Sequence, residues 1–321
     1  MNLKYKLSAK RIFTVILLLI ATIISVACMA FINLESKLNK VNIDKKQIVN
    51  DVKYDQEKSL PSYIKNIALL GIDSSDDNIG RSDCIMIVTI DTEHDKIKLS
   101  SIIRDSYVNI PNKNVNDKIN HAYAFGGPEL TLQTLNENFN LNITEFISAN
   151  LSSFPKIVDD IGGISLNIRD DELVFINNYI QSLNTLNNTT SPYITASGIQ
   201  TVDGTQALAY SRIRYTDGGD FERSHRQRII IEQIFHKMKD QSLDKNYEIL
   251  NLLLPTVDTN LTSSEIFSIC VDLSLMHRNN ITEERFPKDE DSEGKLLNGI
   301  YYYFFDKDST IDKIHKFIYE S

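Results

Sequence analysis

The feature that most constrains this chain is an uncharged apolar run from Ile12 to Leu34. A helix rises about 1.5 Å per residue and crosses a bilayer core with about 20 such residues, so this run can span a membrane. The basic residues before it are Lys4, Lys6, Lys10 and Arg11. Because positive charge stays on the cytoplasmic side, we expect a cytoplasmic basic tail at residues 1–11 and a transmembrane signal anchor at residues 12–34.

Two other kinds of segment share these features, a cleaved signal peptide and a lipoprotein signal ending at Cys28. The apolar part of a cleavable signal is usually only about 7–15 residues long, whereas this run continues past Cys28. Ser25 also stands where a lipoprotein signal prefers a branched aliphatic residue. We therefore favour an uncleaved, single-pass anchor in the cell membrane, followed by a polar extracellular stalk at residues 35–60 and an extracellular catalytic domain at residues 61–321.

Charge and cysteine content exclude several classes of protein. Beyond residue 34 the chain has 30 basic and 43 acidic residues, which argues against nucleic acid as a partner, since binding to a phosphate backbone requires a basic face. There is no C-x-x-C pair, so neither a thiolate metal site nor a redox motif is indicated. Cys84 lies in an apolar strand pattern and is expected to be a small core residue, and a Cys84–Cys270 disulfide is not favoured.

Apolar periodicity in the extracellular part predicts strands mixed with helices. Short apolar runs indicate strands at residues 66–70, 84–90, 97–103 and 164–168, the second and third joined as a hairpin. Helical spacing predicts helices at residues 128–139, 154–161, 221–238, 263–276 and 310–319. Residues 205–214 fit either a helix followed by a strand or one long strand. This mixture predicts an α/β fold, a three-layer α-β-α sandwich around a mixed central sheet.

A cluster of arginines is the strongest chemical signal in the sequence. Five fall within seventeen residues: Arg212, Arg214, Arg223, Arg226 and Arg228. If residues 211–215 are extended, Arg212 and Arg214 share one face. Arg223 and Gln227 are four apart in the next helix and can share a face there, in its first turns, where free N–H groups favour anions. Arginine forks match phosphate oxygens, so the cluster predicts a pyrophosphate site. The alternative is a solvated basic face.

Two aspartates lie at the ends of neighbouring predicted strands. Asp73 ends the first strand and Asp83 opens the second, so adjacent strands would place both carboxylates at one end of the sheet. Two carboxylates together with phosphate oxygens and waters suit Mg²⁺, with Mn²⁺ as a substitute. Either residue alone is more often a turn residue, as the neighbouring Asp76 and Asp77 illustrate.

Three further residues are candidates by their position. Arg104 follows an apolar strand, and the C-terminal end of a strand is where α/β proteins bind ligands. A surface turn stabilised by Arg104 and Asp105 is the alternative. In the segment Asp117–Gly127, Lys118 is the better candidate for a phosphate contact, and His121 is a weaker candidate for a general base.

The order and spacing of these motifs resemble the LytR-CpsA-Psr family. The segments that carry the resemblance are GID, GRSDCIMIVTID, SIIRDSYVNIP, KINHAYAFGG, IVDDIGGISLNI, DGTQALAYSRIR and GDFERSHRQR, between about Asn66 and Met238. One departure is Ile103, which stands where the family usually has proline before the arginine. No Walker loop, dinucleotide fingerprint, G-x-S-x-G elbow or H-E-x-x-H motif competes with this reading.

The resemblance implies a phosphotransferase with an apolar tunnel for a polyprenyl chain and a pyrophosphate at its mouth. The donor would be a polyprenyl-pyrophosphate-linked glycan and the acceptor a muramic acid hydroxyl of peptidoglycan, so that teichoic acid, capsule or a similar polymer becomes attached to the wall with help from Mg²⁺. The family's metal-site acids fall on Asp73 and Asp83. Its phosphate-binding residues fall on Arg81, Arg104, Arg212, Arg214, Arg223 and Gln227.

These expectations give a mechanism and two alternatives. Asp83, Arg104, Arg212 and Arg214 are the predicted catalytic residues, the arginines stabilising the leaving lipid phosphate. Candidates for the tunnel lining are Ile119, Phe125, Phe146 and Phe154, each of which could equally be plain core. A pyrophosphatase would use the same arginines and metal with water as the acceptor. A non-enzymatic envelope regulator or transcriptional attenuator would not depend on the acids.

Overall fold

The computed structural model describes residues 33, 36–37, 39–40, 61–74, 80–113, 115–214, 219–239, 241–276 and 280–320. The predicted basic tail, nearly all of the predicted anchor and most of the predicted stalk lie outside this described part and stay predictions. Among the described helices, none combines the length and apolar character that a membrane span requires.

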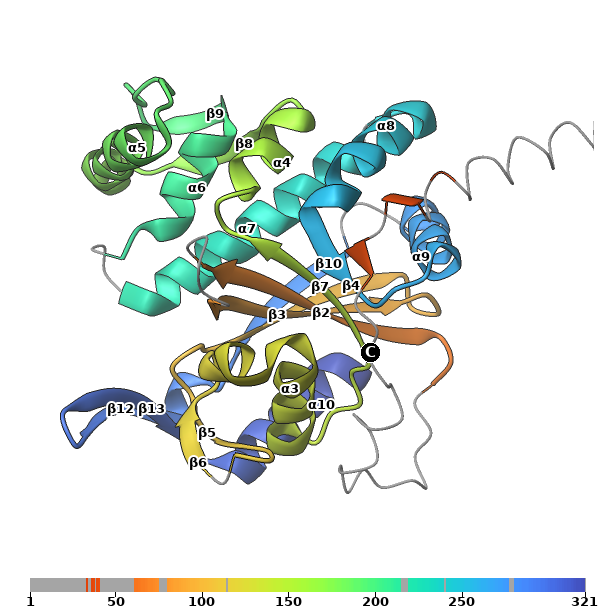
Figure 1. Ribbon diagram of the computed structural model, residues 1–321, viewed down its shortest axis with the longest axis vertical. Coiled ribbons are helices and arrows are strands. Elements are labelled where there is room, and N and C mark those ends of the chain that lie inside the picture. Colours follow the sequence, from red (N-terminus) through yellow and green to blue (C-terminus); the bar gives the residue numbers. More distant parts are fainter. Residues whose placement is uncertain are drawn as a thin grey trace, which may run out of the picture.

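A mixed sheet forms the centre of the molecule (Figure 1). Its described strands, in spatial order, are β1 (Asn39–Lys40), β10 (Val257–Thr259), β7 (Glu145–Asn150), β2 (Ile64–Asp73), β3 (Arg81–Asp91), β4 (Lys96–Ile102) and β11 (Ile281–Phe286). The β2–β3 and β3–β4 pairs are antiparallel, and the β2–β7 and β4–β11 pairs are parallel. The predicted mixed sheet and the predicted hairpin are therefore confirmed.

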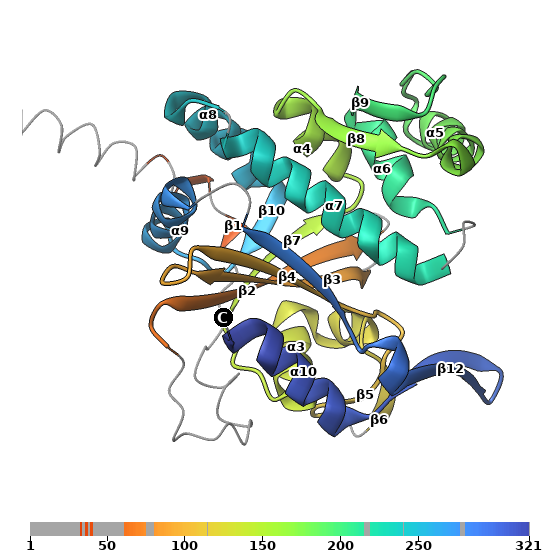
Figure 2. The same ribbon diagram turned by 180° about the vertical axis from the view of Figure 1, so that it is seen from behind.

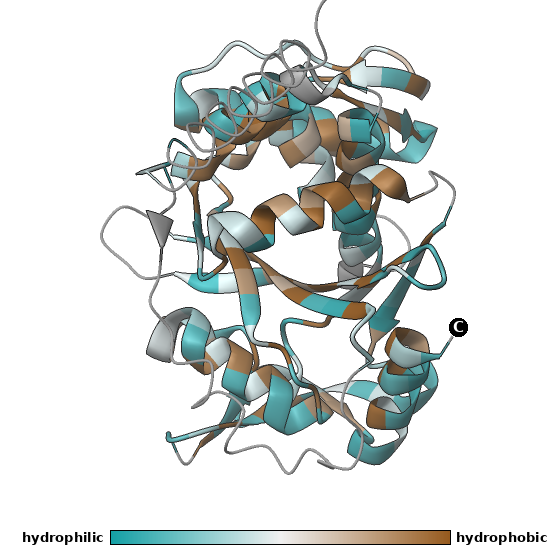
Figure 3. Ribbon diagram, turned by 90° about the vertical axis from the view of Figure 1, so that its right-hand side faces the viewer, coloured by the Kyte–Doolittle hydropathy of each residue, from teal (hydrophilic) through white to brown (hydrophobic). Residues whose placement is uncertain are grey.

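Strand β3 is buried on both faces, which explains why its sequence is a continuous apolar run rather than an alternating one. Ile85 and Ile87 point into one core cluster, whereas Met86 and Val88 point into another on the opposite face. Apolar segments accordingly run through the sheet and through the helices on both sides of it (Figure 3).

Helices α3 (His121–Phe139) and α10 (Lys307–Tyr319) cover one face of the sheet (Figure 1). Leu132 and Phe139 of α3 and Ile314 of α10 are fully buried there. Gly126 and Gly127 interrupt α3 with non-helical backbone just before Pro128. The helix predicted from residue 128 onward is therefore the second part of α3, and the first part reaches back to His121.

Helices α7 (Gly219–Lys239) and α9 (Ser263–Leu275) pack on the other face (Figure 2). Helix α7 is apolar on two sides, because Ile231 and Phe235 face the sheet while Ile230 faces an outer cluster. That outer cluster is formed with α4 (Phe154–Asp160), β8 (Ile164–Ile168), α5 (Leu173–Asn187), β9 (Gly198–Val202), α6 (Gly204–Arg212) and α8 (Leu243–Leu253). The three-layer arrangement thus carries an additional unit outside α7.

The remaining elements are short. They are β5 (Tyr107–Ile110), β6 (Val115–Lys118), β12 (Ser292–Leu297), β13 (Ile300–Phe305), η1 (Asp170–Glu172), η2 (Leu254–Thr256) and η3 (Asp289–Asp291). The β12–β13 hairpin projects from the body beside β5 and β6 (Figure 1). The Tyr303 N–H of β13 donates a hydrogen bond of 2.9 Å to the carbonyl of Asp105, just before β5.

Residues 205–212 are helical, so the alternative of one long strand is wrong. Asp203 and Gln206 form a capping box in which each side chain accepts a hydrogen bond from the other's backbone N–H, at 2.8 and 2.9 Å. This box starts a helix that continues to Arg212. Arg212 and Arg214 therefore do not occupy one face of a strand.

The four residues suggested as a tunnel lining do not share one environment. Ile119 and Phe146 are fully buried in the cluster beneath the sheet, Phe154 packs against the outer cluster, and Phe125 is exposed. The lining of the tunnel therefore stays a prediction.

Candidate active site

Asp73 and Asp83 lie at the same end of adjacent strands, as the sequence predicted. Asp73 pairs with Arg81 across the β2–β3 ladder, and Asp83 is the extra residue of an irregularity next to Gly71. A Cβ at Gly71 would lie 2.9 Å from the Cys84 Cβ, so the close approach of the strands at this irregularity requires glycine. The residue directly opposite Asp73 is Arg81, and Asp83 follows Arg81 by two residues.

Arg104 forms an ion pair with the Asp83 carboxylate through its terminal nitrogen. The Asn120 side-chain amide donates a second hydrogen bond to the same carboxylate, 2.9 Å long. Both ionised side chains are largely buried. The segment after β4 and the residue before α3 thus converge on the start of β3, so Arg104 lies beside Asp83.

Lys118 extends this ion pair into a network. Its ammonium lies 2.7 Å from a carboxylate oxygen of Asp105, whose other oxygen is 3.4 Å from the Arg104 Nε. Lys118 also lies 5.8 Å from the centre of the Tyr302 ring. Two cations and two anions alternate along the network, so its charges balance. An arriving anion can be bound only if the cations exchange their carboxylate partners for it, or if a metal cation takes over the carboxylates.

Arg223 lies behind this network on α7. The side chain is buried, and its positive charge acts on the Cys84 thiol, which places it near the start of β3. Gln227 is one turn further along the same helix and is half-buried. Arg212 is the half-buried last residue of α6, and Arg214 is exposed two residues later. The C-terminal end of α6 lies on the same side of the molecule as the end of β2 (Figure 1).

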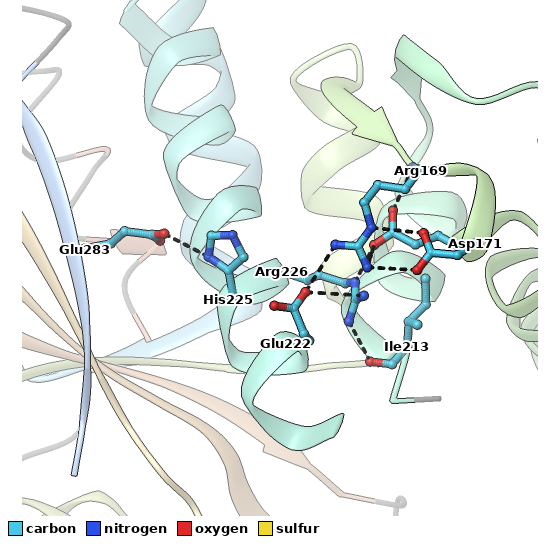
Figure 4. Close-up of polar contacts among 8 residues, drawn as sticks. Arg169, Asp171, Ile213, Glu222, His225, Arg226 and Glu283 are labelled. Carbon is cyan, nitrogen blue, oxygen red and sulfur yellow. Dashed lines mark hydrogen bonds and ion pairs between the residues drawn. The ribbon is translucent and has the colours of Figure 1, made fainter. Parts of the chain in front are cut away.

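Arg226 and Arg228 have structural partners, which corrects their inclusion in a single phosphate-binding cluster. Arg226 donates from Nε to Glu172 at 2.8 Å, and both side chains are only 1% exposed (Figure 4). Arg226 also donates to the Ile213 carbonyl, 3.2 Å. Arg228 donates to Glu283 at 2.9 Å. Two of the five clustered arginines therefore hold α7 against the rest of the fold.

One pair at the edge of the network had only a weak signal in the sequence. The Nδ1 of His121, the first residue of α3, lies 2.8 Å from a carboxylate oxygen of Asp117, which is in β6. Such a carboxylate orients an imidazole. His121 and Lys118 had been grouped in one segment of the sequence, but nothing in the sequence indicated that Asp117 would pair with His121.

The acid pair fits the predicted Mg²⁺. Among the described residues there is no group of three or more His, Cys, Asp or Glu side chains that could hold a metal by themselves. Mg²⁺ needs no such cage, because it keeps several waters and usually takes one or two carboxylates together with substrate phosphates. Asp73, which is exposed, and Asp83 supply such a pair.

Cys84 is expected to be nearly inert toward alkylation. Burial raises the pKa of its thiol to about 11 from an ordinary 9.0, outweighing the opposing effect of Arg223. At pH 8 the native thiol should react about 100-fold more slowly than in the unfolded chain, since only the thiolate reacts. In the unfolded chain the Cys84 thiol ionises around pH 9, whereas in the native chain it ionises only near pH 11. The thiol should therefore lower the free energy of unfolding as pH rises between those values.

Iodoacetamide labelling followed by peptide mass spectrometry would measure this, with the unfolded chain as the reference. Equal rates in the native and unfolded chains would show that Cys84 is not shielded. Cys84 and Cys270 are both free in the described part of the chain, as expected.

Comparison with known proteins identifies relatives that span most of the chain. The sequence model of the LytR_cpsA_psr family matches residues 28–317. A polyisoprenyl-teichoic acid–peptidoglycan teichoic acid transferase TagU from Oceanobacillus iheyensis is 34% identical over 274 residues, which cover 81% of this chain and 78% of the relative.

Solved structures agree in fold. TagT bound to LIIa-WTA superposes with a TM-score of 0.65 at 24% identity, covering 81% of this chain and 92% of the other. TagT with bound octaprenyl pyrophosphate lipid gives a TM-score of 0.61 at 22% identity, covering 81% and 93%.

Proposed function

Because this chain belongs to the LytR-CpsA-Psr family, we propose that it transfers an anionic glycopolymer from a polyprenyl-pyrophosphate carrier to peptidoglycan. The observation that carries the proposal is the network of Asp83, Arg104, Asp105 and Lys118 beside Asp73 at one end of the sheet. The named activity of the TagU relatives and the lipid held by a TagT of the same fold support the choice of donor and acceptor.

We place the chain in the cell membrane with its N-terminus inside and residues 61–321 outside. The support is the uncharged run at residues 12–34 and the basic residues that precede it. This topology puts the acid pair and its arginines on the side of the membrane where peptidoglycan is found.

The proposed step is an attack by a muramic acid hydroxyl on the glycan-side phosphorus. A new P–O bond forms to that hydroxyl oxygen, and the bond to the lipid phosphate breaks. Mg²⁺ held by Asp73 and Asp83 would supply positive charge to the pyrophosphate. Arg104, Arg212 and Arg214 stabilise the departing lipid phosphate, with Arg81, Lys118, Arg223 and Gln227 as further phosphate-binding residues. Asp83 receives the hydroxyl proton on the carboxylate oxygen that the metal would leave free, once Arg104 has moved from that carboxylate to the phosphate.

The direct test is a reaction of the purified full-length chain with lipid-linked glycan phosphate and a peptidoglycan acceptor. Covalently joined glycan and peptidoglycan are expected, together with released polyprenyl phosphate. Release of the glycan phosphate into water, with no joined product, would instead establish a pyrophosphatase.

The acid pair gives a second test. The Asp73→Asn variant should need about 10- to 100-fold more Mg²⁺ for half-maximal transfer, because one of the two carboxylates that attract the cation is neutralised. Metal titration of the transfer rate measures this. The control is Asp160→Asn, which alters an ion pair with Lys156 on α4. If neither Asp73→Asn nor Asp83→Asn changed metal dependence or cell-wall attachment, a non-enzymatic envelope protein would be the better description.

A further inference from the structure

Arg226 lies inside the fold, where a bound phosphate does not reach it. Its side chain is 1% exposed, and its Nε donates at 2.8 Å to the carboxylate of Glu172, which is equally buried. A carboxylate oxygen of Glu222 lies 3.7 Å from its Nη2. Neither carboxylate belongs to the candidate active site, so any influence of Arg226 on that site has to pass through a neighbouring segment.

The neighbouring segment is the one that leaves α6. Arg226 donates from Nη1 to the Ile213 carbonyl at 3.2 Å (Figure 4), and its guanidinium lies 5.7 Å from the centre of the Tyr210 ring of α6. Ile213 directly follows α6, and its backbone is extended, with φ −60° and ψ 125°. Its carbonyl belongs to the same planar peptide group as the N–H of Arg214. The bond from Arg226 therefore fixes the direction in which the chain leaves the helix.

Arg212 and Arg214 stand on either side of this fixed residue. Arg212 is half-buried and Arg214 is exposed, whereas the side chain of Ile213 between them is fully buried in the outer cluster. The helix that holds Ile213 also carries Arg223, three residues before Arg226. Through Arg226, α7 thus sets the relative position of two parts of the proposed phosphate site, its own arginine and the pair after α6.

We propose that Arg226 is a positioning residue, which acts through the Ile213 carbonyl to hold Arg212 and Arg214 in place for the pyrophosphate of the donor. Glu172 in turn fixes the guanidinium of Arg226. The proposal rests on the proposed function, because it requires a phosphate at Arg212 and Arg214. A displacement of about 1 Å in a binding group can cost about 100-fold in rate. Release of Ile213 is therefore expected to affect the site although Arg226 does not meet the substrate.

The double variant Arg226→Met with Glu172→Leu separates positioning from stability, because it removes both buried charges together and leaves the Ile213 carbonyl without its donor. Calorimetric titration of the full-length chain in detergent with octaprenyl pyrophosphate should show about 10- to 100-fold weaker binding, the cost of lost charge-assisted contacts. Arg226→Lys keeps a cation beside Glu172 but not the two bonds of the guanidinium, so it should weaken binding in the same direction even if the double variant does not fold. The matched control, Lys156→Met with Asp160→Leu, removes an ion pair of α4 in the same outer unit and should leave binding within about twofold.

The deciding measurement is the coupling between Arg226 and Arg212. Arg212→Ala alone should weaken binding of octaprenyl pyrophosphate about 10-fold, but only about twofold further in a chain that already carries Arg226→Lys or the double change, because Arg212 is then displaced. Equal losses in both backgrounds would overturn the proposal, since Arg226 would then act on stability alone. No loss from Arg212→Ala in the unchanged chain would also overturn it. Coupling in a chain that joins no glycan to peptidoglycan would support the positioning role and reject the proposed transfer.

Discussion

Replacement of Arg104 by alanine is expected to lower the rate of glycopolymer transfer by about 100- to 1,000-fold, the usual cost of removing one donor to a developing anion in a preorganised site. Arg104 stands between the carboxylates of Asp83 and Asp105 and is largely buried, so its guanidinium is already positioned. Initial rates with lipid-linked glycan and peptidoglycan fragments would give the change in kcat/KM.

Two further variants define what this result means. Arg104→Lys keeps the positive charge but loses the planar guanidinium with its paired N–H donors, so it should recover only part of the activity. Lys156→Ala removes an exposed cation paired with Asp160 on α4 and should leave the rate within about twofold, as expected for a surface ion pair. Wild-type activity in a folded Arg104→Ala chain would exclude the network from the reaction.

Replacement of Arg226 by methionine is expected to reduce the free energy of unfolding by about 3 kcal/mol, the lower end of the cost of breaking a buried ion pair, because the buried Glu172 carboxylate keeps only Arg169 beside it, at 3.5 Å. Both side chains are 1% exposed, and Arg226 additionally donates to the Ile213 carbonyl. Urea unfolding of the purified chain, followed by circular dichroism, would measure the loss.

The double variant Arg226→Met with Glu172→Leu should recover much of that stability, since no buried charge is then left alone. Lys245→Met is the control, because Lys245 and Glu248 form an exposed pair whose loss should cost less than about 1 kcal/mol. A double variant no more stable than the single one would show that the pair contributes more than mutual neutralisation.

The central sheet was predictable because its strands are buried on both faces. A strand such as β3 must then be apolar at almost every position, and that is the pattern visible in the sequence. The segment that became α6 was not decided, since its apolar residues fit both periods and the deciding feature is the Asp203–Gln206 capping box. Helix α5 and the β12–β13 hairpin were not predicted; their many polar or exposed positions weaken the apolar pattern.

The site was predictable where neighbours in sequence are neighbours in space. Asp73 and Asp83 flank one strand connection, so their position at the same end of the sheet followed from the expectation that the two strands are adjacent. The partners of Arg226 and Arg228 could not be predicted, because Glu172 and Glu283 are 54 and 55 residues away from them along the chain. An analysis based on spacing along the chain therefore grouped two arginines that stabilise the fold with those proposed to bind phosphate. The predicted role of Arg81 came from family resemblance alone, whereas the spacing had already placed Gln227 on one helix face with Arg223.

The length of β3 has a consequence for where the chemistry takes place. Asp83 lies near its first residue, while Ile90, near its last, packs in the cluster that includes Met276 just after α9. Seven residues of extended chain separate them, a span of about 23 Å at roughly 3.3 Å per residue. Phosphates bound at the Asp83 end of the sheet would lie about that far from the Met276 end, so the chemistry would be confined to one edge of the domain.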